Sequence, residues 1–311
     1  MDTSSYVIGI DGGGTQSQAV ALDLGGQPLS NVKGGPLNYH LTGIDTFSSN
    51  IESLILSIEA NHKPALCRKI VVGTATFFDH PHDNALTLLA PLQKRWKQIE
   101  FRGDAITAVT AATGGKAGIV IISGTGSIAA RVNHQYEATF RGGLGAFLGG
   151  DPGSAYWIVC ETLRQLQPLT SEQLRRSPIW QRLTKELSLD HADWESTVSK
   201  CVSLAQQVEP LAKLSKHLAH HCQDDPLWRS VESETGHALA SLGAPLCQAG
   251  LSLPVSLMGS VLQSNSNIRQ ATMAQLQKLS GSPITFKEPL YSPAEGAALL
   301  ALQSLKRDST S

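Results

Sequence analysis

The sequence carries little charge, few aromatic side chains and no long hydrophobic run. Only 16% of its 311 residues are charged and 5% are aromatic, while Lys plus Arg (25) nearly balances Asp plus Glu (26). The formal net charge of -1 gives no general attraction for a polyanion, which argues against nucleic acid and membrane surfaces as partners. No apolar stretch approaches the ~20 residues that a membrane-spanning helix needs. Hydrophobic residues at 41%, without low-complexity tracts, predict a folded globular protein.

Cysteine is scarce, and its pattern does not fit a disulfide framework. The five cysteines stand far apart, contain no C-x-x-C pair and are odd in number, so we expect reduced and mostly buried thiols. The segment Met1–Ser5 lacks the basic region of a secretory signal and leads directly into an apolar run. No N-x-S/T glycosylation site occurs. These features predict a cytoplasmic protein.

The first third of the chain alternates strand-like and helix-like segments. Tyr6–Ile10 and Gln18–Leu22 are short apolar runs on either side of a glycine cluster, which predicts two strands joined by a turn. From Asp45 onward, apolar residues recur at spacings of three and four, as on the buried face of a helix. Strands at 69–73 and 99–101, and helices at 86–92 and 105–113, continue the series. The alternation predicts a mixed sheet flanked by helices.

The opening pattern is repeated after Gly114-Gly115. A strand-like run over Gly118–Ile122 is followed by the glycine turn Ser123–Ser127 and a second strand to Val132. The repeat predicts two related halves, although two unrelated hairpins would look the same. We therefore expect an N-terminal lobe over 1–114 and a C-terminal lobe over 115–292. The second lobe would carry a helical insertion at about 153–246 and a strand at 254–258, and a helix at about 293–306 would pack back on the first lobe.

Two glycine loops have the composition of phosphate-binding turns. Asp11-Gly12-Gly13-Gly14-Thr15 follows a strand directly, so its backbone N–H groups can approach an anion closely, and Thr15 adds a hydroxyl donor. Asp11 can hold a cation or a metal-bound water. An ordinary tight hairpin with a turn aspartate is the alternative. Ser123-Gly124-Thr125-Gly126-Ser127 offers a second loop of the same design, and no Walker motif G-x-x-x-x-G-K-[ST] is present.

Taken in order, these loops and several other motifs resemble the N-acetylglucosamine and glucosamine kinases, in the superfamily of actin, hexokinase and heat-shock ATPases. The resemblance spans nearly the whole chain. Its motifs are Gly9–Thr15, Asn38, Gly103-Asp104-Ala105, Ile122–Ser127, Gly149–Trp157, Met258-Gly259-Ser260 and Glu295-Gly296-Ala297. It implies an α/β fold of two ribonuclease-H-like domains, each with a mixed sheet flanked by helices, around a central cleft that holds ATP and the sugar.

The resemblance also implies roles for single residues. Asp104 would be the catalytic base that takes the proton of a sugar hydroxyl, although its place before Ala105 is also that of a helix N-cap. Asp11 would bind Mg²⁺ through water. ATP would be bound by Asp11, Gly12, Gly13, Gly14 and Thr15, by Gly124, Thr125, Gly126 and Ser127, and by Gly259 and Ser260. The sugar would contact Asn38, Tyr39, Asp104, Gly143, Leu144, Gly145 and Asp151.

The sequence departs from the family in the loop 141–152. This loop is longer than the usual form, has Leu144 where Trp is frequent, and has Pro152 where an acid or Gln is frequent. Asp151 has a second interpretation as the N-cap of the following helix. These departures leave open whether the amino sugar is N-acetylglucosamine or glucosamine.

The expected function is an ATP- and Mg²⁺-dependent kinase that phosphorylates the 6-hydroxyl of N-acetylglucosamine. Its partners would be the sugar and ATP, and a homodimer is compatible with it. Two alternatives share the fold: a non-catalytic sugar sensor, and an activator-type ATPase with an iron–sulfur cluster. The cluster needs thiolate ligands, and none of the cysteines lies in or beside a glycine loop.

Overall fold

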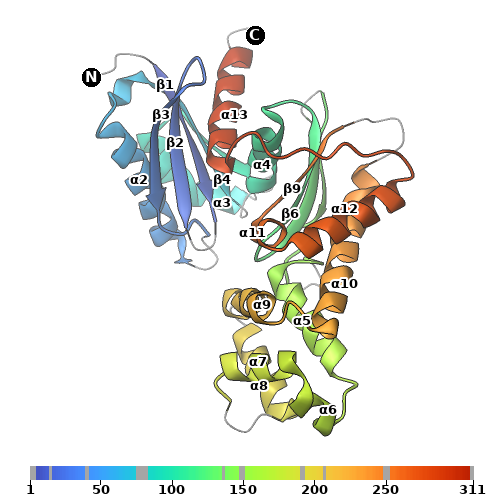
Figure 1. The fold of residues 1–311 in the computed structure, drawn as a ribbon. Helices are drawn as coiled ribbons and strands as arrows, with labels where there is room; N and C mark the ends of the chain where they lie inside the picture. The colour runs from blue at the N-terminus through green and yellow to red at the C-terminus, as the bar shows by residue number, and fades with distance from the viewer. Residues whose placement is uncertain are drawn as a thin grey trace. The chain divides into compact units, whose positions relative to one another are not determined.

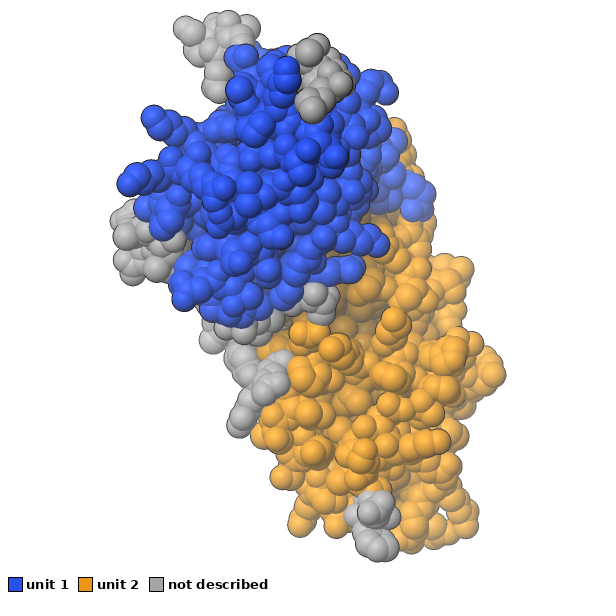
Figure 2. Space-filling model, turned by 90° about the vertical axis from the view of Figure 1, so that its left-hand side faces the viewer, with its two compact units in different colours: residues 1–118, 132–138, 288–311 blue, residues 119–131, 139–287 orange. Residues whose placement is uncertain are grey.

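The computed structural model describes residues 5–13, 16–38, 42–74, 83–134, 137–146, 151–189, 193–205, 208–247 and 253–308. The chain divides into two compact units, coloured separately in Figure 2. Unit 1 comprises residues 1–118, 132–138 and 288–311, and unit 2 comprises 119–131 and 139–287. Each unit contains a sheet with helices packed on it (Figure 1), which confirms the predicted α/β fold class. Within the described part of the chain, no helix is long and apolar enough to cross a membrane.

Unit 1 is built on a five-stranded mixed sheet in the order β3-β2-β1-β4-β5. Its strands are β1 (Tyr6–Gly12), β2 (Ser17–Asp23), β3 (Pro28–Gly34), β4 (Cys67–Thr74) and β5 (Ile99–Gly103). The first three form an antiparallel meander, whereas β1, β4 and β5 run parallel. The carboxyl ends of these three parallel strands therefore meet at one edge of the sheet.

Helices cover both faces of this sheet, so β1 is buried on both sides. They are α2 (Ile44–Glu59), α3 (Asp83–Arg95), α4 (Asp104–Thr113) and α13 (Pro293–Asp308), with a short 3₁₀ helix η1 (Pro64–Leu66). Ile8 and Ile10 pack in one core with the buried side of α2, while Val7 packs in another with α13. This alternation follows the two-residue period of a strand. Figure 1 shows α2 and α13 on opposite sides of the sheet.

Unit 2 contains a four-stranded sheet in the order β8-β7-β6-β9. Its strands are β6 (Gly118–Ser123), β7 (Ser127–Val132), β8 (Ala138–Gly142) and β9 (Val255–Met258). Strands β6 and β9 are parallel, with Ile119 opposite Val255 and Ile122 opposite Met258. Their carboxyl ends place the turn after Ser123 beside the turn after Met258.

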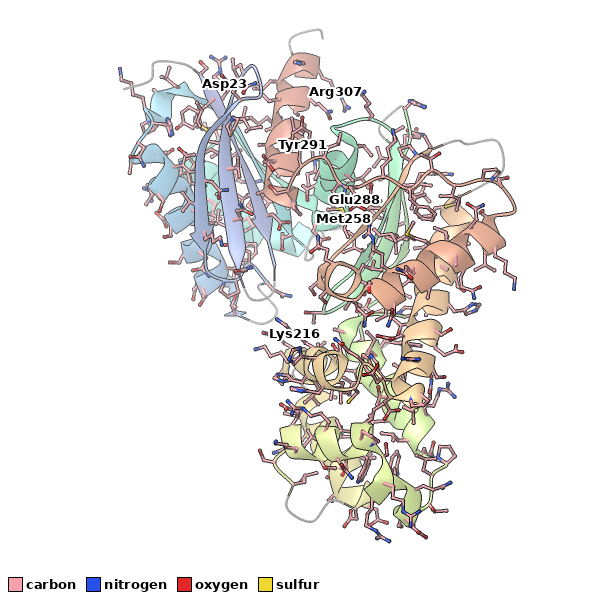
Figure 3. All side chains as sticks on the ribbon, viewed as in Figure 1. Asp23, Lys216, Met258, Glu288, Tyr291 and Arg307 are labelled. Atoms are coloured by element: carbon pink, nitrogen blue, oxygen red, sulfur yellow. The ribbon has the colours of Figure 1, made fainter. Side chains whose placement is uncertain are left out.

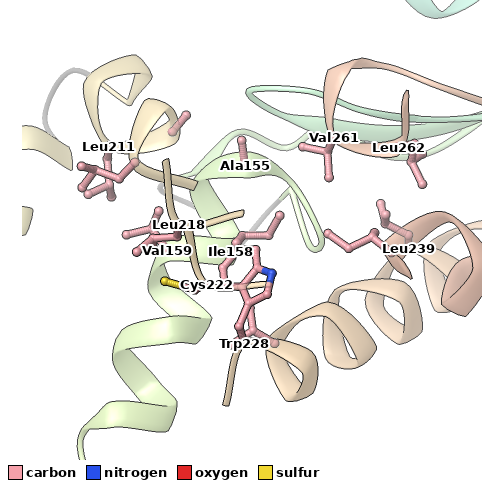
Figure 4. Packing of buried hydrophobic residues seen from close by; sticks show 14 of the residues in the cluster. Ala155, Ile158, Val159, Leu211, Leu218, Cys222, Trp228, Leu239, Val261 and Leu262 are labelled. Carbon is pink, nitrogen blue, oxygen red and sulfur yellow. The ribbon is translucent and has the colours of Figure 1, made fainter. Parts of the chain in front are cut away.

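The rest of unit 2 is mainly helical, including most of the segment 153–246 where a helical insertion is expected. Its helices are α5 (Ala155–Leu166), α6 (Ser171–Arg176), α7 (Pro178–Glu186), α8 (Trp194–Ala205), α9 (Glu209–His221), α10 (Pro226–Gly243), η3 (Ala244–Leu246), α11 (Ser260–Ser264) and α12 (Ser266–Ser280). Side chains of Ser154, Thr170, Ser177, Asp225 and Asn265 cap five of them. One apolar core joins the helices to the sheet, and Figure 4 shows Trp228 within it.

Candidate functional site

The edge where β1, β4 and β5 end gathers the predicted site residues of unit 1. Gly12 is opposite Thr74, and Thr74 is opposite Gly103, so Asp11 and Asp104 lie at the same edge. Crevices outside the carboxyl ends of parallel strands are where open α/β sheets bind ligands. The strand register therefore brings together two carboxylates that stand 93 positions apart in the sequence.

The first glycine loop is fixed to the segment that precedes Asn38. The N–H of Gly13 donates to the Gln16 carbonyl at 3.1 Å, and the Gly13 carbonyl accepts from Leu37 N–H at 2.9 Å. The hydroxyl of the buried Thr74 donates to the Leu37 carbonyl at 2.9 Å. These bonds hold Asn38 at the edge that carries the two carboxylates. Gly14, Thr15 and Tyr39, which the sequence also assigns to the site, lie outside the described residues.

Asp11 and Asp104 are two half-buried carboxylates, and the charge of Asp104 affects the ionisation of Asp11. Burial, with a further contribution from the negative charge of Asp104, raises the pKa of Asp11 to about 7. Burial also raises the pKa of Asp104, although backbone N–H groups of Asp104 and Ala105 stabilise its charged form. Carboxyl groups with raised pKa values at the end of a strand are candidates for proton transfer or for binding a cation.

This electrostatic cost predicts a pH-dependent stability. The pKa of Asp11 is about 7 in the folded protein, against an ordinary value of about 4, so folding stability falls as the pH rises through this window. Asp11→Asn removes the cost, and we expect its Tm to exceed that of wild type by at least about 2 °C at pH 8 but not at pH 4. Thermal unfolding followed by circular dichroism at both pH values measures it. Asp23→Asn, which removes one carboxylate from β2, is the control for net charge, and an equal Tm gain in both variants would contradict the explanation.

Asp104 is the first residue of α4, and the structure assigns the cap position to Gly103, which has no side-chain capping bond. The carboxylate still accepts hydrogen bonds from backbone N–H groups of the first turn. The backbone carbonyl of Asp104 accepts from the Thr107 hydroxyl at 2.9 Å. An acid in the first turn is favourable at the positive end of the helix dipole. The helix thus positions the carboxylate at the strand edge.

In unit 2, the second glycine loop connects β6 to β7 and is hydrogen-bonded to residues 152–155. The hydroxyls of Ser123 and Ser127 donate to the carbonyls of Gly153 and Pro152 at 2.7 and 2.9 Å, and Ala155 N–H donates to the Gly124 carbonyl at 2.8 Å. The Ser127 hydroxyl therefore already donates its hydrogen bond to the Pro152 carbonyl. Thr125 at the tip is exposed, which leaves it accessible to a ligand.

The turn after β9 lies against this loop. Gly259 has φ +93°, and a Cβ atom there would stand 2.2 Å from the Ser123 carbonyl oxygen, so only glycine fits. A Cβ at Gly124 would lie 3.8 Å from the Ser260 hydroxyl. Figure 3 labels Met258, the last residue of β9 before this turn. The structure therefore brings the predicted residues 124–127 and 259–260 together.

Asp151 lies beneath the second loop and is not a helix cap. The cap of α5 is Ser154, whose hydroxyl accepts from Trp157 N–H at 3.1 Å. Asp151 is 8% exposed. Burial raises its pKa, while hydrogen bonds from backbone N–H of Ser127 and Gly145 favour the charged form. The cap interpretation is therefore wrong, and the carboxylate joins two loops.

The loop that carries Gly143, Leu144 and Gly145 adjoins the glycine loop. Gly143 N–H donates to the Ser127 carbonyl at 3.0 Å. Gly143 and Gly145 have φ values of +69° and +80°, and the Leu144 side chain is 65% exposed. An exposed leucine between two glycines is a surface that a ligand can cover. Residues 147–150 of the same motif lie outside the described residues.

Unit 2 also contains a cavity that the sequence analysis did not predict. Its volume is about 790 Å³, and its lining comes from α9, α10 and the junction of α11 with α12. The lining residues include Lys216, Arg229, Glu232, Ser264 and Asn267. Lys216 is labelled in Figure 3. Ser264, one of the lining residues, lies one helical turn after Ser260, and its hydroxyl donates to the Ser260 carbonyl at 2.6 Å.

The buried carboxylate of Glu232 organises one wall of this cavity. It accepts from the Trp228 indole N–H at 2.8 Å, from Asn265 Nδ2 at 2.7 Å and from Asn267 Nδ2 at 2.8 Å. The carboxylate thus accepts from three neutral donors, and it holds the two asparagine amides in place at the start of α12. No sequence motif marks this set, because its members come together only through the packing of α10 on α12.

The described residues fit the magnesium nucleotide that the sequence predicts. They contain no group of three or more His, Cys, Asp or Glu side chains that could hold a metal ion. Mg²⁺ does not require such a cage, since it keeps several waters and is usually bound by one or two carboxylates together with substrate phosphates. Asp11 supplies such a carboxylate at the strand edge.

Solved structures share this fold. A proposed N-acetylglucosamine kinase from Chromobacterium violaceum matches with a TM-score of 0.75 at 21% identity, covering 97% of this chain and 100% of that chain. A ROK family glucokinase from Streptomyces griseus, in complex with glucose and AMPPNP, matches with a TM-score of 0.59 at 17% identity, covering 96% and 100%.

Two curated relatives match more closely in sequence over part of the chain. An N-acetyl-D-glucosamine kinase of Dictyostelium discoideum is 31% identical over 193 residues, which are 58% of this chain and 60% of the relative. An N-acetylmuramic acid/N-acetylglucosamine kinase of Clostridium acetobutylicum is 30% identical over 167 residues, 51% of this chain and 52% of the relative. The matches thus span about half to three fifths of these relatives. The model of the BadF/BadG/BcrA/BcrD ATPase family matches residues 8–301, nearly the whole chain, and the chain belongs to that family.

Proposed function

We propose that the protein is an ATP-dependent amino-sugar kinase that transfers a phosphoryl group to the 6-hydroxyl of N-acetylglucosamine. Membership of an ATPase family supports the use of ATP, and two relatives named as N-acetylglucosamine kinases support the sugar. The observation that carries the proposal is the pairing of Asp11 and Asp104 at the ends of parallel strands. This edge offers one carboxylate for a cation and another for a proton.

Asp104 acts as the general base in this proposal. When bound, ATP supplies the phosphoryl group, and Mg²⁺ supplies the positive charge that offsets the negative charge of the phosphates. The Asp104 carboxylate accepts the proton from the attacking sugar hydroxyl as that oxygen bonds to the γ-phosphorus, and the bond between the γ-phosphorus and the departing ADP breaks. Burial raises the pKa of Asp104, which makes it a stronger proton acceptor than an exposed aspartate. Its bonds to the first turn of α4 keep it oriented.

Other residues bind and orient the two substrates. Asp11 holds Mg²⁺ through a coordinated water, and the backbone N–H groups of the two glycine loops bind phosphate oxygens. Asn38 binds the sugar at the edge of unit 1. Tyr39 and the loop Gly143–Gly145 are the further sugar contacts that the resemblance implies. An amide and a carboxylate can donate to and accept from hydroxyls of the same ring.

The cavity of unit 2 accommodates the nucleoside end of ATP. Its volume of about 790 Å³ falls in the range of small-molecule sites, and Ser264 of its lining lies one helical turn beyond Ser260. The amides held by Glu232 and the hydroxyl of Ser264 offer donors and acceptors for a base and a ribose. Lys216 adds a positive charge for the polyphosphate.

A pair of lysines on α9 tests this assignment. Lys216→Ala should raise the KM for ATP about tenfold at low salt, because a hydrogen bond to a charged group contributes ~1.5–3 kcal/mol. Lys213→Ala is the matched control, since Lys213 is also exposed on α9 but pairs with Glu209 at 3.0 Å. Steady-state kinetics with each substrate varied in turn measures both constants. Equal ATP KM values in the two variants would show that the cavity does not bind the nucleotide.

The activator-type ATPase is the competing function within the same family. Its cluster would need thiolates, but burial raises the pKa of Cys67 to about 12 and of Cys201 to about 11. Burial also raises the pKa of Cys222 and Cys247 to about 11. These cysteines pack in the apolar cores and do not line a glycine loop. The placement of these four cysteines in the apolar cores favours the kinase.

An ADP-release screen against hexoses and amino sugars tests the function directly. We expect ADP formation to depend on an amino sugar, with N-acetylglucosamine giving the highest kcat/KM. A preference for glucosamine would identify the free amine as the substrate feature. An ADP-release rate that is the same with and without each sugar would favour the activator ATPase. Sugar binding without ADP release would favour a sensor.

A further inference from the structure

Glu232 and two asparagines form a hydrogen-bonded network in one wall of the unit 2 cavity. The Glu232 side chain is 4% exposed, and its carboxylate accepts from Asn265 Nδ2 at 2.7 Å and from Asn267 Nδ2 at 2.8 Å. The indole N–H of Trp228, a fully buried residue one turn earlier on α10, donates to the same carboxylate at 2.8 Å. The carboxylate is therefore held from the core side and presents itself to both amides.

A carboxylate sets the orientation of an amide beside it. A carboxylate only accepts hydrogen bonds, whereas an asparagine amide has an oxygen that accepts and an NH₂ group that donates. The NH₂ groups of Asn265 and Asn267 must both face Glu232, because turning either amide over would place its oxygen against a carboxylate oxygen. The packing of α10 on α12 thus fixes each amide in one of its two orientations.

The two amides differ in what they leave available to a ligand. Asn265 is the N-cap of α12, and its oxygen already accepts from Ile268 N–H at 3.0 Å. Asn267 is exposed and lines the cavity, and its oxygen accepts no hydrogen bond from any described residue. Asn267 therefore offers the cavity an oriented acceptor, together with the one N–H that Glu232 does not use.

We propose that Asn267, oriented by Glu232, makes the cavity selective for adenine over guanine. Adenine has an amino group at its 6-position, which donates, beside N7, which accepts, so an asparagine amide can bind both at once. Guanine has an oxygen at the 6-position, which would face the Asn267 oxygen, and Glu232 prevents the amide from turning over to relieve the repulsion. Asn267 is then the residue that determines specificity, and Glu232 is a positioning residue that acts through it.

This selectivity rests on the proposed function in one respect, that the cavity takes the nucleoside end of the nucleotide. Calorimetry with the non-hydrolysed analogues AMPPNP and GMPPNP, with Mg²⁺ and without sugar, tests it. Wild type should bind AMPPNP at least about tenfold more tightly than GMPPNP. Asn267→Ala should bring the two Kd values to within about threefold, mainly by weakening AMPPNP. Equal affinities in wild type, binding of neither analogue, or unchanged selectivity in Asn267→Ala would overturn the proposal.

Glu232→Gln tests the positioning role by its effect on the ratio of the two affinities. A glutamine has nearly the same shape but can also donate, so the Asn267 amide becomes free to turn over and donate to guanine. We expect the ratio of the GMPPNP and AMPPNP Kd values to fall at least about fivefold. Glu234→Gln is the matched control, because Glu234 is an exposed glutamate on the same helix, and it should keep the wild-type ratio.

A merely structural role of Glu232 would give a different result. Glu232→Gln would then weaken both analogues by the same factor and leave the ratio unchanged, which would overturn the positioning role. Asn267→Ala still decides the selectivity if Glu232→Gln does not fold, because Asn267 is exposed. If wild type distinguishes the two analogues but phosphorylates no amino sugar, the proposed function fails while the role of Asn267 stands.

Discussion

Asp104→Asn is expected to lower kcat by about 10²–10⁴-fold, the usual contribution of a general base. The amide keeps the size of the side chain and an oxygen that can accept from the first turn of α4, but it cannot accept a proton at neutral pH. The KM values for ATP and sugar should change little, because the lost interaction belongs to the transition state. Steady-state kinetics of the purified variant measures all three constants.

Asp45→Asn is the matched control for this substitution. Asp45 lies in the first turn of α2 as Asp104 lies in the first turn of α4, so both changes remove an acid near a helix N-terminus. The control should retain the kcat of wild type. Turnover of Asp104→Asn close to wild type would exclude Asp104 as the base, and an equal loss in both variants would point to a general effect on folding.

Gly259→Ala is expected to produce the largest loss of stability and to abolish nucleotide binding. A Cβ at this position would stand 2.2 Å from the Ser123 carbonyl oxygen and 2.9 Å from the Ser123 nitrogen, so backbone must move. The φ of +93° adds strain for any residue with a side chain. Because β6 and β9 both end here, the shift displaces the second glycine loop. We expect a Tm drop of more than about 8 °C, or no soluble protein.

Gly281→Ala separates backbone strain from steric clash. Gly281 caps α12 with φ +65°, and a Cβ there meets no atom within 4 Å. Its loss should cost about 1 kcal/mol, or a few degrees of Tm, and leave nucleotide affinity unchanged. Similar Tm values for the two alanine variants would show that the close approach of Gly259 to Ser123 does not matter.

The strands and the first loop of the site could be predicted because their sequence signals are local. Apolar runs next to glycine clusters predicted β1, β2, β6 and β7, and the three-and-four spacing of Phe47, Ile51 and Leu54 predicted α2. Gly114 ends α4 in the left-handed conformation, as its position after the helix predicted. The place of Asp104 followed from the order of motifs, and the structure adds its neighbour Asp11.

Features that depend on long-range packing could not be predicted. Strand β8 (Ala138–Gly142) lacks fully buried residues, so it shows no strong apolar alternation. The cavity beside Glu232 forms only when α10 packs on α12. Asp151 looks like a helix cap in sequence, because its contacts with Ser127 and Gly145 come from loops that precede it in the chain.

The position of the transferred phosphate distinguishes a kinase acting on the 6-hydroxyl from the other functions. The purified protein is incubated with ATP, Mg²⁺ and N-acetylglucosamine, and the product is examined by two-dimensional ¹H–³¹P NMR. We expect a new phosphorus signal coupled to the two methylene protons at C6, and we expect no such signal with Asp104→Asn over the same period. Phosphate on a different carbon, or inorganic phosphate as the sole product, would contradict it.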